Sequence, residues 1–85
     1  MALQAPILTI DVHGCLVEEA VSKVEKLVES AGPAVYRIRV IHGYHGGTRI
    51  REGIRRELGY GLVPRIKRIV PGENEGITEL ILREY

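Results

Sequence analysis

Two histidine-glycine steps stand out in this sequence, and each follows a segment rich in Val and Ile. The first run, Ile7 to Asp11, leads into Val12-His13-Gly14, and the second run, Val35 to Ile41, leads into His42-Gly43. Asp11 and His13 are two residues apart, a spacing at which side chains leave the same face of a strand. A carboxylate beside an imidazole holds the ring and raises its basicity, which suits general acid–base catalysis.

The Asp11 and His13 pair also has a purely structural interpretation, in which the aspartate caps the next helix and the histidine fills the strand end. His42 favours the catalytic interpretation. Two strands joined by a helix are expected to be parallel, and their C-terminal ends then meet at the sheet edge where α/β folds bind ligands. We therefore predict that Asp11, His13 and His42 share one cleft and are catalytic.

The second step opens a glycine-rich segment, Gly43-Tyr44-His45-Gly46-Gly47-Thr48. Glycines let the backbone approach a ligand, and the start of the next helix offers unpaired N–H groups, so this loop is predicted to bind phosphate. Arg49 and Arg51 would add positive charge for the same anion, and Tyr44 could stack on a base. The alternative is an ordinary loop in which the glycines adopt positive φ angles and Thr48 caps the helix.

The surrounding residues predict the order β-α-β-α-β-β. Apolar residues recur every three or four positions over residues 17–31 and 48–58, which indicates two helices. Strands are expected over residues 7–11, 35–41, 63–70 and 77–83. Because only about six residues join the last two strands, they should form an antiparallel hairpin. The expected fold is a single small α/β domain over residues 1–85, with its core over about 7–83, two helices and a mixed four-stranded sheet.

Length and composition argue against a membrane-spanning, a disulfide-linked and a zinc-binding protein. The chain has 85 residues, enough for one domain, and lacks the apolar run of about 18 residues that a membrane span needs. The single cysteine, Cys15, excludes an internal disulfide and fits a reducing, cytoplasmic compartment. No zinc-binding spacing is present, and we expect no metal and no cofactor.

The formal net charge is only +1, but nine of the twelve basic residues lie between positions 35 and 70. They could form a face for a phosphate backbone or a solvated charged surface.

The order and spacing of these motifs resemble those of the small MutS-related (Smr) domain. The family's Leu-Asp-x-His-Gly motif is matched by Ile10-Asp11-Val12-His13-Gly14, and its His-Gly-x-Gly motif by the segment from His42 to Gly47. Its late glycine and threonine are matched by Gly76-Ile77-Thr78. The second loop is one residue longer than the family pattern, and His45 stands where that pattern has its second glycine.

The resemblance implies a fold similar to the C-terminal domain of translation initiation factor three. It also implies nucleic-acid binding, to RNA or DNA, with nicking or RNA-cleaving endonuclease activity. Catalytic roles are implied for the residues matching Asp11 and His13, and a larger protein that delivers the substrate is a common feature of the family.

We therefore predict a nucleic-acid-binding domain that cleaves phosphodiester bonds. His13 would be the general base or acid, Asp11 its orienting group, and His42 a second acid–base group or electrostatic stabiliser. Gly43, Gly46 and Gly47 would present backbone N–H groups to the phosphate. One alternative is a module that binds nucleic acid or a ribosomal surface without cleavage, and another is a binder of small anions or nucleotides.

Overall fold

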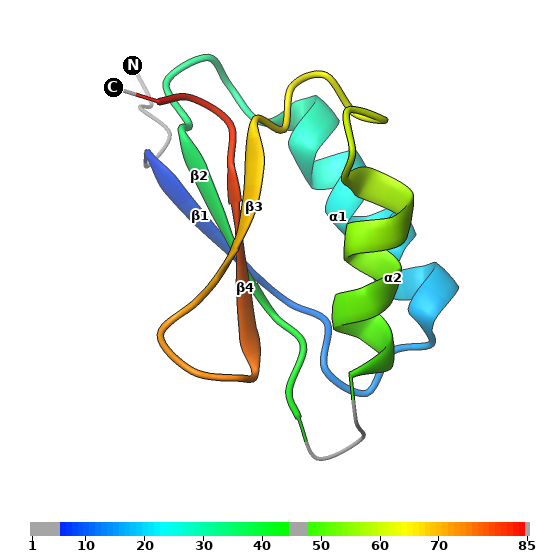
Figure 1. The fold of residues 1–85 in the computed structure, drawn as a ribbon. Coiled ribbons are helices and arrows are strands. Elements are labelled where there is room, and N and C mark those ends of the chain that lie inside the picture. Colours follow the sequence, from blue (N-terminus) through cyan, green and yellow to red (C-terminus); the bar gives the residue numbers. More distant parts are fainter. Residues whose placement is uncertain (1–5, 45–47, 85) are drawn as a thin grey trace.

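Apolar residues at intervals of three and four hold two helices against one face of a four-stranded sheet (Figure 1). The structure is a computed structural model and describes residues 6–44 and 48–84. Its elements are β1 (Ile7–Asp11), α1 (Val17–Ser30), β2 (Arg37–Ile41), α2 (Arg49–Leu58), β3 (Arg68–Pro71) and β4 (Ile77–Ile81). The predicted β-α-β-α-β-β order is confirmed.

The sheet has the strand order β1-β2-β4-β3. β1 pairs with β2 in parallel, so that Asp11 stands beside Ile41 where both strands end. β4 is antiparallel to β2 and to β3. The predicted parallel pair and C-terminal hairpin are therefore confirmed, and the sheet is mixed. This topology brings the ends of β1 and β2 to the same edge as the starts of α1 and α2.

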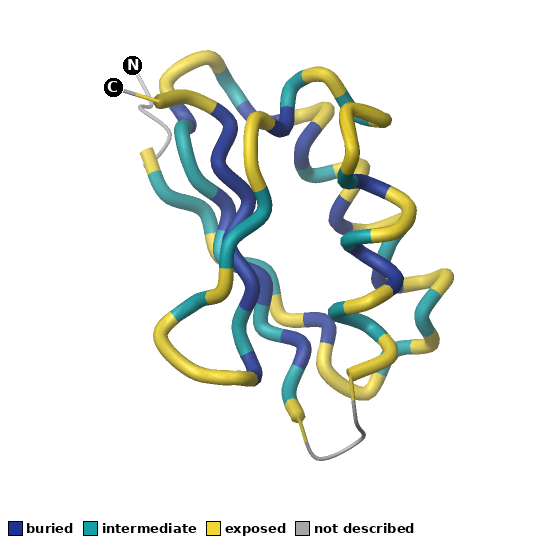
Figure 2. Tube along the Cα trace, in the orientation of Figure 1, coloured by how far each residue is buried: buried dark blue, intermediate teal, exposed yellow. Residues whose placement is uncertain are grey.

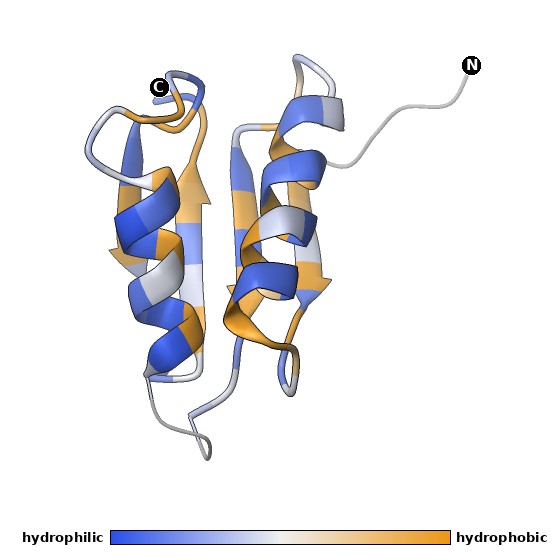
Figure 3. Cartoon of the chain, turned by 90° about the vertical axis from the view of Figure 1, so that its right-hand side faces the viewer, coloured by the Kyte–Doolittle hydropathy of each residue, from blue (hydrophilic) through white to orange (hydrophobic). Residues whose placement is uncertain are grey.

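The core lies between the sheet and the helices, which lie side by side in Figure 3. Alternate residues of β2 and β4, such as Val40 and Leu80, are fully buried against α1 and α2, and Figure 2 shows this inner layer as buried. The other face of the sheet has no helix among the described residues. There the Arg37 side chain donates to the carboxylate of Glu79 over 3.0 Å, which balances the charge of that buried carboxylate. No helix in the described part of the chain is long and apolar enough to cross a membrane.

The third strand begins later than predicted, at Arg68 instead of residue 63. The N–H group of Ile66 donates to the carbonyl of Val63, which folds this segment into a turn. The Arg65 guanidinium then reaches the end of α1 and donates to the carbonyls of Val28, Ala31 and Gly32 over 2.5–2.8 Å. Carbonyls at a helix C-terminus lack partners within the helix, so Arg65 satisfies them.

Gly53 lies where α2 crosses α1. A Cβ atom at this position would overlap the side chain of Val17, so the absence of a side chain lets the two helices approach each other. A glycine inside a helix otherwise lowers stability by about 1 kcal/mol relative to alanine. Its role is close packing between helices.

We expect Gly53→Ala to destabilise the protein by up to about 2 kcal/mol. Overpacking costs about 1–3 kcal/mol and the better helix propensity of alanine offsets about 1 kcal/mol. Urea unfolding of Gly53→Ala, Val17→Ala and the double variant measures the coupling between the two sites. In the Val17→Ala background, Gly53→Ala should leave the free energy of unfolding unchanged or raise it. If Gly53→Ala lowers it equally in the wild-type and Val17→Ala backgrounds, the contact between the two positions is contradicted.

Candidate functional site

A cleft of about 560 Å³ opens where β1 and β2 end and both helices begin. The loop after β1 contributes His13 and Cys15 to its wall, and the loop after β2 contributes His42 and Tyr44. Arg49, the first residue of α2, completes it. The cleft therefore lies at the C-terminal ends of adjacent parallel strands, the usual position of ligand sites in α/β sheets.

His13 and Asp11 form a hydrogen-bonded pair on the rim of this cleft. The ring nitrogen Nδ1 of His13 lies 2.6 Å from Oδ1 of Asp11, which also accepts from the His13 backbone N–H over 3.0 Å. An ionised carboxylate only accepts, so Nδ1 carries the proton and Nε2 of the neutral ring keeps its lone pair. The His13 side chain is 71% exposed, so solvent and ligands can reach it.

The structural alternative for this pair, an aspartate that caps α1, does not describe the molecule. The Asp11 carboxylate is taken up by His13. At the start of α1 it is Glu19 that accepts, through Oε1, from the N–H of Leu16 over 3.1 Å. Asp11 therefore orients the imidazole and leaves the helix cap to another carboxylate.

The hydrogen bond from the His13 ring, followed by the one from its backbone N–H, lowers the pKa of Asp11 below the ordinary carboxyl value. Both bonds favour the ionised form. A carboxyl whose pKa is lowered by folding stabilises the native state above its unfolded pKa, near 3.9. That contribution disappears as the pH falls through the folded pKa.

We accordingly expect the Asp11–His13 contact to persist on acidification to about pH 4 and to be lost only below it. Carbon-13 NMR of the Asp11 carboxyl should give a titration midpoint below the ordinary aspartate value. In His13→Ala the midpoint should rise, because both the ring and its hydrogen bond are gone. A midpoint that is the same in the two proteins would show that the pair does not form in solution.

His42 lies deeper, with only 6% of its surface exposed, and both of its ring nitrogens have partners. Nδ1 is 2.8 Å from the Gly43 carbonyl, and Nε2 is 2.8 Å from the hydroxyl of Thr78 on β4. A carbonyl only accepts, so Nδ1 carries a proton and the neutral ring accepts the Thr78 hydroxyl at Nε2. His42 thus links the loop after β2 to the neighbouring strand.

The backbone of the same loop is tied to Gly76, just before β4. The N–H groups of His42 and Gly43 both donate to the Gly76 carbonyl, over 2.9 and 3.0 Å. The Gly43 N–H, predicted to face a phosphate, is therefore occupied by a protein acceptor. A Cβ atom on Gly76 would lie 2.9 Å from the Tyr44 ring, so the approach requires glycine. Gly76 and Thr78 were missing from the predicted site, although the glycine–x–threonine spacing was the signal for them.

Of the remaining predicted residues, the structure places some on the wall of the cleft and others away from it. Tyr44 is half-exposed and lines the cleft, as does Arg49. Thr48 precedes α2 and donates its hydroxyl to Glu52 over 2.9 Å, without capping the helix through its side chain. Arg51 does not line the cleft. His45, Gly46 and Gly47 lie outside the described residues.

Over residues 6–44 and 48–84, no cluster of three or more His, Cys, Asp or Glu side chains could hold a metal ion. The described part of the cleft therefore offers one accessible acid–base pair, one cation and an exposed aromatic ring. This set suits an anionic ligand that carries a planar group.

The sequence matches no protein-family model and no curated protein. Among solved structures, the chain is similar to the Smr domain of Thermus thermophilus MutS2, with a TM-score of 0.78 and 26% sequence identity. The similarity covers 91% of this chain and 99% of that one. The similarity therefore extends over most of the fold.

Proposed function

Because this chain is an Smr-like domain, we propose that it binds nucleic acid in the cleft between its two histidine-glycine loops and cleaves the phosphodiester backbone there. The observation that supports this proposal is the Asp11–His13 pair. Its carboxylate holds Nδ1 at 2.6 Å and leaves Nε2 accessible on the cleft wall. A positioned imidazole of this kind is the usual general base of a metal-independent transfer reaction.

In the proposed reaction, Nε2 of His13 accepts the proton of the attacking hydroxyl. That hydroxyl belongs to water or, in RNA, to the neighbouring 2′ position. The new oxygen–phosphorus bond forms as the bond to the leaving oxygen breaks, and the leaving oxygen takes a proton from the imidazolium or from solvent. Asp11 stabilises the imidazolium, and Arg49 pairs with the phosphate oxygens that gain charge.

For His42 we propose a positioning role in place of the acid–base role predicted from the sequence. Its two ring nitrogens are engaged by Gly43 and Thr78. A proton transfer at either nitrogen would first have to break one of these bonds. The ring instead fixes the loop that faces His13.

A binding module without cleavage is the second candidate. With His42 engaged, His13 is the one accessible histidine among the described cleft residues, and the loop that would stabilise the transition state is longer than in the family pattern. Such a module would dock on RNA, on a ribosomal surface or beside a larger protein that delivers the substrate. The two candidates make opposite predictions for turnover.

The decisive experiment incubates the pure protein with labelled single- and double-stranded RNA and DNA, each with Mg²⁺ or with EDTA. Products that accumulate with wild-type protein but not with His13→Ala purified in parallel support cleavage at this site and exclude a contaminating nuclease. Binding without products under every condition would favour the binding module. Absence of binding to all four ligands at low salt would reject cleavage and binding of nucleic acid, and would favour a protein or a small anion as the ligand.

Arg49 should contribute more than Arg51 to nucleic-acid binding in the cleft, because of the two only Arg49 lines it. We expect Arg49→Ala to weaken binding of a single-stranded trinucleotide and to reduce the salt slope by about 0.7, the value for one phosphate contact. Arg51→Ala should leave binding of this short ligand unchanged. Titrations at several salt concentrations measure both quantities, and equal losses in the two variants would contradict the assignment.

A further inference from the structure

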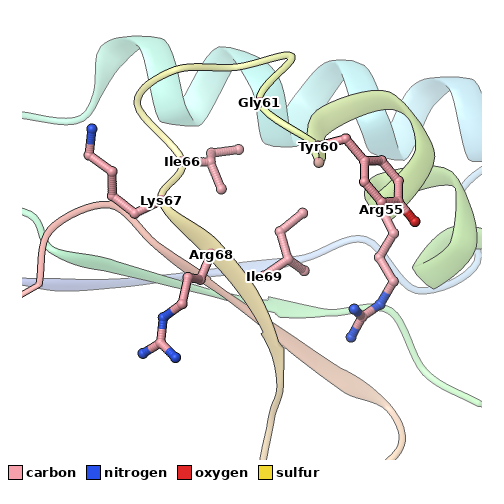
Figure 4. Close-up of a pocket in the computed structure, with 8 residues that line it drawn as sticks. Arg55, Tyr60, Gly61, Ile66, Lys67, Arg68 and Ile69 are labelled. Carbon is pink, nitrogen blue, oxygen red and sulfur yellow. The ribbon is translucent and has the colours of Figure 1, made fainter.

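A second pocket, of about 260 Å³, lies at the opposite end of α2 from the cleft. Arg55 and the turn after α2 form one side of it, and the residues leading into β3 form the other. Figure 4 shows Ile66 and Ile69 between Arg55 and Tyr60 on one side and Arg68 on the other. The pocket is slightly smaller than the roughly 300–1,000 Å³ of sites for drug-sized ligands, which suits a single planar group.

Tyr60 has an unusual conformation at the edge of this pocket. The residue is 90% exposed, and its φ of +56° makes it the one described non-glycine residue with a positive φ. Bulky side chains rarely adopt this conformation, and glycine adopts it freely. An exposed ring contributes little to the core, so stability does not explain a tyrosine here. Strained residues of this kind concentrate at functional sites.

The same pocket is surrounded by positive charge. Arg55, Lys67 and Arg68 all line it, and no acidic residue does. Arg68 is paired with Glu84, and Lys67 donates to the Pro64 carbonyl over 3.3 Å. Within residues 6–44 and 48–84, the Arg55 guanidinium makes no ion pair. The pocket therefore combines an available cation for an anion with an aromatic ring for a flat group.

The helix α2 connects this pocket to the cleft. Arg49 lines the cleft and Gly59 lines the pocket, ten residues later. At 1.5 Å per residue this separation is about 15 Å, a distance that a few nucleotides of one strand can span. Arg51 lies one turn before Arg55 on the same side of the helix, so a further cation lies along the route.

We propose that the pocket beside Tyr60 binds one unpaired nucleotide of a single strand whose backbone also occupies the cleft. The base stacks on the Tyr60 ring and its phosphate pairs with Arg55. A base within a duplex has both faces covered by its neighbours, so this contact selects single-stranded nucleic acid. The inference rests on the proposed function, because the cleft must first hold the same strand.

The test measures fluorescence anisotropy of a labelled single-stranded 12-mer and of its duplex with wild-type protein and Tyr60→Gly. Glycine removes the ring and suits the positive φ, so this variant should fold at least as well as the wild type. Base–aromatic stacking corresponds to an expected loss of about 5- to 140-fold in single-strand affinity. Tyr60→Phe should retain wild-type affinity, and duplex binding should be similar in all three proteins.

Arg55 and Arg56 offer a matched pair of charge variants. Both lie on α2, but Arg56 is beside Glu57 on the side that faces α1 and does not line the pocket. Arg55→Ala should weaken single-strand binding, whereas Arg56→Ala should not. Equal effects would show that general charge, and not the pocket, attracts the strand, and would overturn the proposal.

Unchanged single-strand affinity of Tyr60→Gly would also overturn the proposal. If Arg49→Ala still weakens binding in that case, the proposed function of the cleft stands. An equal loss of duplex and single-strand affinity in Tyr60→Gly would overturn recognition of an unpaired base. If the wild type binds neither ligand, the proposed function and this inference both fail.

Discussion

Replacement of His13 by alanine is expected to lower the rate of phosphodiester cleavage by about 10²–10⁴-fold, the usual contribution of a positioned acid–base group. The imidazole is the accessible proton acceptor of the described cleft, and Asp11 already holds it in one tautomer. Affinity should remain close to that of the wild type, because His13 is one contact among several. Single-turnover rates and binding titrations on the same oligonucleotide separate these two effects.

Two controls accompany this measurement. The His13 side chain is 71% exposed, so the melting temperature of His13→Ala should stay near the wild-type value. Asp11→Asn preserves an acceptor for the ring but removes the charge that stabilises the imidazolium. Its loss of rate should therefore be comparable to that of His13→Ala or smaller. A cleaving protein that is indifferent to both substitutions would place the reaction elsewhere.

Replacement of His42 by alanine is expected to destabilise the fold by about 2–4 kcal/mol and to reduce binding and cleavage together. The change removes a buried ring, opens a cavity and leaves the Thr78 hydroxyl without this partner. The loop after β2 then loses one of its links to β4. Urea unfolding gives the change in stability, and the activity assay is run below the unfolding transition.

Thr78→Val distinguishes a positioning role for His42 from an acid–base role. The variant keeps the imidazole but removes its hydroxyl partner, at an expected cost of about 1–3 kcal/mol. If His42 positions the loop, Thr78→Val should lower both binding and cleavage, as His42→Ala does. The ratio of the two losses should be the same in both variants. Near-normal cleavage in Thr78→Val, with a collapsed rate in His42→Ala, would instead assign proton transfer to His42. Thr9→Val, at an exposed position of β1, is the matched control.

The order of the elements and the Asp11–His13 pair could both be predicted from the sequence alone. Both depend on local spacing. Apolar residues at intervals of three and four dictate a helix wherever a core is available, and two residues separated by one share a face of an extended chain. The parallel pairing of β1 and β2 follows because a helix is the natural crossover between them. The β-α-β-α-β-β order could therefore be predicted from local spacing, whereas the resemblance to the Smr domain rests on the motifs around Asp11, His42 and Gly76.

The hydrogen-bond partners of His42, in contrast, could not be predicted from the sequence. Thr78 lies on β4 and Gly76 lies just before it, and the hydrogen bonds of His42 to these two residues exist because the antiparallel register sets Ile41 beside Ile77. The same holds for Arg65, whose guanidinium caps a helix more than thirty residues earlier. Such contacts join segments distant in sequence, and local periodicity carries no information about which donor will meet which acceptor. The role of a polar side chain is therefore settled when the layers pack and each buried polar group must find a partner.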